Sequence, residues 1–188
     1  MKFIFNNLAF NKGEILMNEM NKTELKKMED NMLEFRNKLE KFHLDINSEN
    51  PMQIILKGNL YIEYALRERL KGHLENPQIL ECDKLSFSQL AKLVFSLGLL
   101  PVDIFKTVME VNHIRNSYSH NLKYNFNDEE FRRLEDTFSP AFKNMYLSFL
   151  RPHKFPVNTL IKLQTAIFTI WQLIINRYNM IENPKENN

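Results

Sequence analysis

The chain has 188 residues, of which 25 are Lys or Arg and 23 are Asp or Glu, so its formal net charge is +2. A charge this small gives no argument for nucleic-acid binding by itself. The single cysteine, Cys82, and the four glycines exclude an intrachain disulfide, a cysteine-rich zinc site and a glycine-rich phosphate loop. A site that needs neither a metal nor a cofactor is the expectation that remains.

The hydrophobic segments predict a protein that is not inserted in a membrane. The longest apolar-leaning stretch, Leu160 to Ile175, is interrupted by Lys162, Gln164 and Gln172, whereas a membrane-spanning helix needs ~20 mostly apolar residues. The first ten residues lack the uninterrupted apolar region of a signal peptide. We therefore expect a soluble, cytoplasmic protein.

The two ends of the chain are expected to lie outside the folded domain. Lys12 to Met17 can be encoded by a purine-rich stretch that resembles a ribosome-binding site followed by a start codon. Residues 1–17 are therefore interpreted either as a mis-annotated extension, with translation starting at Met17, or as a flexible tail. We expect one helical domain over residues 18–182 and a flexible polar tail over 183–188.

Apolar spacing predicts an all-α fold, a single bundle of about five to six helices. Strand-like alternation is scarce, whereas apolar residues recur at steps of three and four and helix start and stop signals are frequent. The expected helices span about 18–44, 51–74, 86–98, 101–120, a helix from 127 that Pro140 kinks or splits, and 157–180.

Capping residues mark most of these predicted starts and stops. Asn50 precedes Pro51 in an N-cap pattern, and Ser86 with Gln89 forms a capping box. Gly98 is a predicted helix end, and Asn127 is a predicted N-cap.

Two charged residues fall on predicted apolar faces. Glu63 lies within the apolar stripe of residues 55–74, and Arg115 lies between Val111 and Tyr118 in a stripe that extends to Leu122. A lone charge in an apolar stripe is costly unless it is paired. We therefore expect Glu63 and Arg115 to meet, either as a structural ion pair or with Glu63 orienting a guanidinium that also faces a phosphate.

The opposite face of the same predicted helix carries His113, Asn116 and His120. Two histidines seven residues apart on a helix are about 10 Å apart, which is too far to share one metal ion. This face is therefore a candidate site without a metal, although a lone histidine on a helix surface usually has no such role.

The segment VNHIRNSYSHNL, residues 111–122, resembles the signature of the HEPN superfamily, in which Arg and a polar residue precede a His near a helix end. Two upstream segments, KGNLYIEYALRERL (57–70) and LSFSQLAKLVFSLGLL (85–100), are similar to the mannitol-operon-repressor-like branch of helical proteins. The resemblance covers about residues 50–125.

The resemblance implies a HEPN-like helical bundle that often forms a homodimer. In many members it implies a metal-independent endoribonuclease with the two Arg and His motifs facing each other across the dimer cleft. Such proteins act as toxins or anti-phage effectors, so an antitoxin or regulatory partner protein is also implied. RNA is the expected substrate and no cofactor is expected.

The residue types fit this chemistry. An imidazole with an ordinary pKa of ~6.5 moves protons at neutral pH, so His120 is the candidate general acid or base. Arg115 is the candidate phosphate stabiliser, because its planar fork of donors fits phosphate oxygens. Asn116 is expected to orient His120, and Glu63 to hold Arg115. Candidate RNA-binding residues are His113, Tyr118 and Lys123, with Tyr118 and Tyr124 as candidate base-stacking residues.

Two questions stay open from the sequence. Residues five apart differ by ~140° around a helix, so Arg115 and His120 share a site only if the helix ends or unwinds near Ser119, the Arg arm swings round, or a dimer partner supplies one residue. The function is also open, because the segments also fit a non-catalytic mannitol-repressor-like regulator or interaction module and, as a weaker third option, an antitoxin-like partner of another enzyme.

Overall fold

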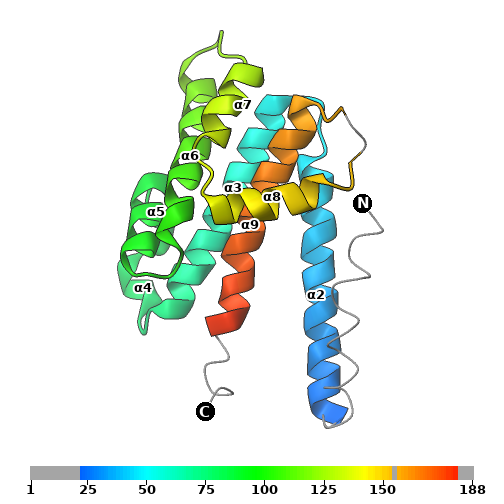
Figure 1. Cartoon of the computed structure of the whole chain (residues 1–188). Helices are drawn as coiled ribbons and strands as arrows, with labels where there is room; N and C mark the ends of the chain where they lie inside the picture. Colours follow the sequence, from blue (N-terminus) through cyan, green and yellow to red (C-terminus); the bar gives the residue numbers. More distant parts are fainter. Residues whose placement is uncertain (1–21, 154–155, 182–188) are drawn as a thin grey trace. The chain divides into compact units, whose positions relative to one another are not determined.

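The computed structural model describes residues 22–153 and 156–181, and over these residues the regular structure is entirely helical (Figure 1). The predicted all-α class is therefore confirmed for the described chain. Two compact units make up the chain, Met1–Asp45 and Ile46–Asn188. The predicted domain limits near residues 17 and 183 and the alternative start at Met17 lie outside the described residues.

Helix α2, Lys22–Ile46, supplies the described part of the first unit. Its apolar stripe follows the predicted three- and four-residue steps. The stripe is buried at Leu39 and Phe42, whereas Met28 and Met32 are exposed. The predicted beginning of this helix at Asn18 lies outside the described residues.

The second unit contains the remaining described helices. In chain order they are α3 (Pro51–His73), α4 (Pro77–Leu80), the 3-10 helix η1 (Cys82–Lys84), α5 (Phe87–Ser96), the 3-10 helix η2 (Val102–Ile104), α6 (Phe105–His120), α7 (Asp128–Glu135), α8 (Pro140–Leu150) and α9 (Thr159–Ile181).

The predicted capping residues hold most of these helix ends. The Asn50 side chain accepts a hydrogen bond of 2.9 Å from the Met52 amide, and Ser86 and Gln89 form a reciprocal capping box. Asn127 accepts hydrogen bonds from two amides of the first turn of α7. After α5, Gly98 adopts a left-handed conformation with φ of 68°, which glycine adopts without steric cost.

Of the two helix boundaries predicted at prolines, the one at Pro140 is confirmed and the one at Pro101 is only partly correct. Pro140 splits the predicted helix, because α7 ends at Glu135 and α8 begins at Pro140 behind the Ser139 cap. The helix predicted from Pro101 begins instead as η2, and α6 starts at Phe105. The short helices α4 and η1 were not predicted.

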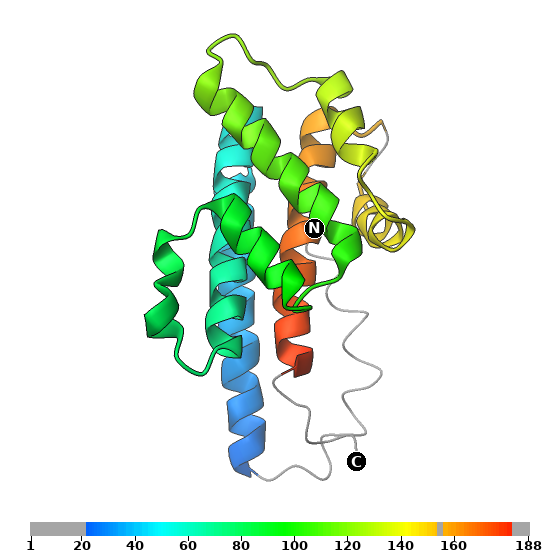
Figure 2. The same ribbon diagram turned by 90° about the vertical axis from the view of Figure 1, so that its left-hand side faces the viewer.

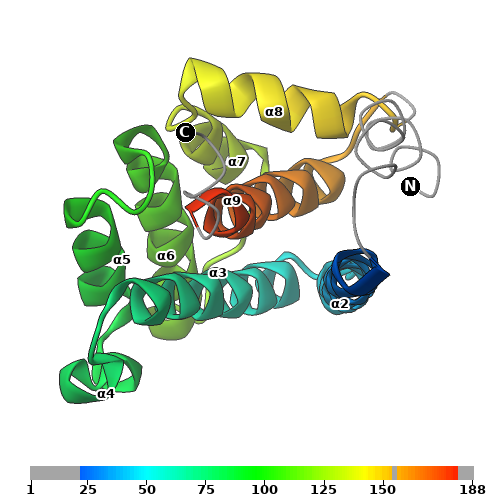
Figure 3. The same cartoon turned by 90° about the horizontal axis from the view of Figure 1, so that it is seen from below.

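Helices α3 and α9 form the centre of the second unit and run side by side in the same direction (Figures 1 and 3). Gly58 of α3 faces Ile167 of α9 so closely that a Cβ at residue 58 would overlap the Ile167 methyl group. In Figure 3, α9 lies between α3 and α8. The absence of a side chain at Gly58 is what permits this close approach.

Helix α6 crosses this central pair obliquely (Figure 2). It packs on α3 and α5 and also contacts α7. Its buried residues end at Ile114, so the two turns that follow extend past the core of the unit. These two turns carry the predicted motif.

The buried charge of this core is neither of the two residues that the apolar stripes indicated. Arg69 is 3% exposed and donates hydrogen bonds from Nε to Leu99 O at 2.7 Å and from Nη1 to Ile174 O at 2.8 Å. Leu60, by contrast, is 60% exposed and Leu122 is fully exposed. Leu60, within the predicted apolar stripe of residues 55–74, and Leu122, at the end of the second predicted stripe, therefore lie outside the core.

Candidate functional site

The predicted motif lies on the last two turns of α6. The helix continues through His120, and the Asn121 amide still donates to Ser117 O at 3.0 Å. Arg115 and His120 are exposed and Asn116 is partly exposed. The motif is therefore presented to solvent on a regular helix end.

Arg115 reaches the face of Asn116. Its Nη1 donates a hydrogen bond of 3.0 Å to Asn116 Oδ1. Asn116 and His120 are four residues apart in an unbroken helix and so share one face. Of the alternatives left open by the sequence, the helix end near Ser119 is found at His120, without unwinding before it. The Arg115 side chain also turns toward Asn116. Whether a second copy adds residues stays a prediction.

The expected pairing of Glu63 with Arg115 is wrong. Glu63 forms its ion pair with Arg67, one turn later on α3, and Arg67 also donates to the main-chain oxygens of Cys82 and Leu85. A guanidinium within the same helix satisfies Glu63, so the carboxylate needs no partner from α6. Its role is to help Arg67 hold the η1 segment on α3.

Arg115 lies outside the core because the last turns of α6 extend beyond the helices on which α6 packs. The buried apolar residues of α6 are Val108, Val111 and Ile114, and none follows them, as expected when two helices cross at an angle and separate beyond the crossing. A uniform stripe extended to Leu122 misses this limit. The guanidinium therefore remains in solvent, where it is available to a ligand.

The predicted RNA-binding residues lie near the end of α6 and differ in solvent exposure and in side-chain contacts. His113 and Lys123 are exposed. The Tyr118 hydroxyl accepts a hydrogen bond of 3.2 Å from the Phe126 amide, and its ring packs edge-on against Tyr124 at 4.8 Å. Tyr118 and Tyr124 thus shape the loop after α6, a role that the stacking prediction did not include.

One interaction beside the motif was not predicted. The Tyr124 hydroxyl donates a hydrogen bond of 2.8 Å to Glu130 Oε2 on α7. Burial raises the pKa of Tyr124 above its usual value, and the bond to the Glu130 carboxylate raises it further. The sequence shows acidic residues at this helix start, but nothing in it indicates which of them turns toward a tyrosine.

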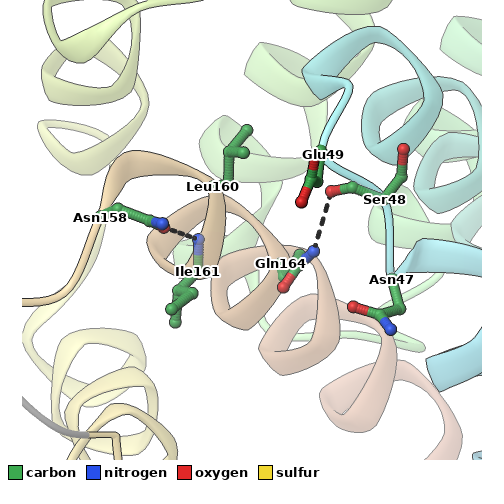
Figure 4. A pocket seen from close by; sticks show the side chains of 7 residues that line it. All are labelled: Asn47, Ser48, Glu49, Asn158, Leu160, Ile161 and Gln164. Atoms are coloured by element: carbon green, nitrogen blue, oxygen red, sulfur yellow. Dashed lines mark hydrogen bonds between the residues drawn. The ribbon is translucent and has the colours of Figure 1, made fainter.

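A separate pocket of about 390 Å³ lies where α3 and α9 begin (Figure 4). Gln164 spans it by donating to Ile46 O at 3.1 Å and Ser48 O at 3.3 Å. None of its lining residues belongs to the motif. The lining residues are Asn47, Ser48, Glu49, Asn158, Leu160, Ile161 and Gln164.

Within residues 22–153 and 156–181, no group of three or more His, Cys, Asp or Glu side chains is arranged to hold a metal ion. Over the same part of the chain, no helix is long and apolar enough to span a lipid bilayer. Comparison of the chain with protein-family models, curated proteins and solved structures finds no match.

Proposed function

We propose that the chain is a metal-independent endoribonuclease of the HEPN type, acting as a toxin or anti-phage effector. The observation that carries the proposal is the hydrogen bond from Arg115 to Asn116, which directs a guanidinium toward the helix face of His120. An imidazole and a guanidinium on one exposed face fit a phosphodiester that is cleaved by its own neighbouring hydroxyl.

The reaction would be an in-line displacement at phosphorus. The 2′-oxygen attacks, the bond from phosphorus to the 5′-oxygen breaks, and the products are a 2′,3′-cyclic phosphate and a 5′-hydroxyl. His120 would take the proton from the 2′-hydroxyl or give one to the leaving 5′-oxygen. Arg115 would donate hydrogen bonds to the non-bridging oxygens as negative charge develops on them.

A homodimer would supply both a proton acceptor and a proton donor. The HEPN resemblance implies that two such motifs face each other across a dimer cleft, so that one His120 would accept a proton while its counterpart donates one. The exposure of Arg115 and His120 supports this arrangement, because both side chains remain accessible to a second copy and to RNA. Lys123 and His113 would contribute contacts to neighbouring phosphates.

The test compares RNA cleavage by the wild type and by His120→Ala, with His73→Ala as the matched control. His73 is also an exposed histidine at the last position of a helix, α3. Loss of a positioned general acid or base should reduce cleavage by about 10²–10⁴-fold, whereas His73→Ala should cleave normally. The products should carry 5′-hydroxyl ends, and a chelator should leave the rate unchanged.

Two outcomes would contradict the proposed function or its mechanism. Wild-type protein that leaves RNA intact, alone and during stress or infection in cells, would count against the proposal. Cleavage that a chelator stops would contradict the metal-independent mechanism.

A second candidate is a non-catalytic helical regulator or interaction module. The observation that favours it is the outward face of α3, where Leu60 and Tyr64 are 60% and 63% exposed one turn apart. A partner helix would cover these side chains. In that case a cellular phenotype would survive His120→Ala and disappear in Leu60→Ser.

A further inference from the structure

The end of α6 has little support from its own packing. Ile114 is the last buried residue of the helix, and His120 is its last helical residue. Helix termini with few buried contacts open locally at low free-energy cost. Some other interaction must therefore keep the final turn wound if His120 is to stay on the face of Asn116.

The loop after α6 folds back to supply that interaction. The Phe126 amide donates to Tyr118 Oη at 3.2 Å, so the loop is bonded to the side chain of a residue within the last turn and a half of the helix. The rings of Tyr118 and Tyr124 meet edge-on at 4.8 Å, with an interplanar angle of 89°. Phe126 itself is 5% exposed, which anchors the downstream end of the loop.

The contact continues from the loop into α7. Tyr124 Oη donates to Glu130 Oε2 at 2.8 Å, and the other oxygen of Glu130 is 2.9 Å from Arg133 Nη1. The Glu130 side chain is only 16% exposed, and its amide donates to the Asn127 cap at 3.1 Å. The carboxylate is therefore a fixed acceptor on a helix that is itself packed into the unit through Phe131 and Leu134.

We propose that Tyr118, Tyr124 and Glu130 form a clamp that positions His120 by keeping the last turn of α6 wound. The three residues act through the helix end and the loop, so they are positioning residues rather than catalytic ones. The inference rests on the proposed function for its consequence in RNA cleavage, while the clamp itself is a property of the fold.

The experiment uses the full chain with Tyr124→Phe and Glu130→Ala. Glu129→Ala is the matched control, because Glu129 also pairs with Arg133, at 3.2 Å, and its side chain is 72% exposed on the same first turn of α7. Glu130→Gln is the conservative variant, since its amide oxygen still accepts a hydrogen bond from Tyr124. Cooperative thermal unfolding of each variant establishes that it folds.

The first measurement is hydrogen exchange of the Asn121 amide, which is bonded to Ser117 O at the end of α6. Loss of a hydrogen bond to a charged acceptor should accelerate this exchange by about tenfold or more in Tyr124→Phe and Glu130→Ala. Glu129→Ala should exchange like the wild type, and Glu130→Gln, which keeps a neutral acceptor, should exchange more slowly than Glu130→Ala. Unchanged exchange in Tyr124→Phe would overturn the clamp whatever the protein does to RNA.

The second measurement is the kinetics of RNA cleavage. Because the clamp places His120 rather than binding RNA, kcat should fall by about tenfold in Tyr124→Phe and KM should stay the same. Faster exchange with an unchanged kcat would overturn the positioning role and leave the proposed function standing. Wild-type protein with no cleavage activity would overturn the proposed function and the positioning of His120 for catalysis, while the exchange result would still decide the clamp.

Discussion

Arg115 donates a hydrogen bond of 3.0 Å to Asn116, its immediate neighbour, instead of pairing with Glu63. This contact turns the guanidinium of Arg115 toward the helix face that Asn116 shares with His120, although Arg115 itself is on a different face. Residues five apart in an undistorted helix can therefore serve one site without unwinding.

The contact makes Arg115→Lys an informative substitution. Lysine keeps the positive charge but lacks the planar fork that reaches both a phosphate oxygen and Asn116. We expect a loss of about 10²-fold in kcat for Arg115→Lys in RNA cleavage, as for removal of one transition-state donor. Arg36→Ala removes an exposed arginine from α2 and serves as the control. Full activity in Arg115→Lys would show that charge alone suffices.

Glu63 should prove irrelevant to RNA cleavage. In Glu63→Ala, Arg67 still donates to the main-chain oxygens of Cys82 and Leu85. The Arg67 guanidinium therefore keeps two hydrogen-bond acceptors. The expected loss in the free energy of unfolding is therefore about 1 kcal/mol or less, as for a partly exposed pair. Urea unfolding measures the stability, and the cleavage rate should match that of the wild type. A selective loss of cleavage would restore a link between Glu63 and the motif.

Arg69 should be far more important to stability than either of the two charges that the sequence indicated. Arg69→Met removes one hydrogen bond each from the main-chain oxygens of Leu99 and Ile174 in the core. Hydrogen bonds from a charged group contribute about 1.5–3 kcal/mol each, so we expect a loss of about 3 kcal/mol or more in urea unfolding. A loss below 1 kcal/mol would mean that methionine packing compensates for both bonds, as replacement of buried charges by apolar residues sometimes does.

Gly58 should resist replacement although it lies within a helix. Alanine normally stabilises a helix by about 1 kcal/mol relative to glycine, but its Cβ would overlap Ile167 Cγ2. The β-branched side chain of Ile167 is fully buried and rotationally restricted, so overpacking should cost about 1–3 kcal/mol in thermal or urea unfolding. Combining Gly58→Ala with Ile167→Ala should give a smaller loss than the sum of the two single variants.

Alkaline pH should destabilise the fold through its buried tyrosines. Burial is the main cause that raises the pKa of both Tyr124 and Tyr146 above the usual value of 10.0. The unfolded state then releases these protons at a lower pH than the native state does. The free energy of unfolding is therefore unaffected by these tyrosines below about pH 10 and decreases above it. Urea unfolding across this range measures the decline, which should be shallower in Tyr124→Phe. An equally steep decline in that variant would remove Tyr124 as a source.

Prediction of the fold from sequence succeeded where the determinant is local. The caps at Asn50, Ser86 and Asn127 bind amides within their own helices, and the split at Pro140 follows from the missing amide and the steric demands of the ring. These interactions depend on residues a few positions apart, so spacing alone identifies them. The motif on α6 was located in the same way, because its helix and its end are local features.

Assignments that depend on distant packing failed. The sequence by itself determined that the described chain is helical, where most helices begin and end, and that Arg115, Asn116 and His120 lie near a helix end. Only the tertiary structure decided that Arg69 is the buried charge, that Glu63 pairs with Arg67, and that Leu60 and Leu122 face solvent. The physical reason is that the angle at which helices cross sets which part of an apolar stripe is covered, and that angle arises from contacts such as Gly58 on Ile167, far apart in the chain.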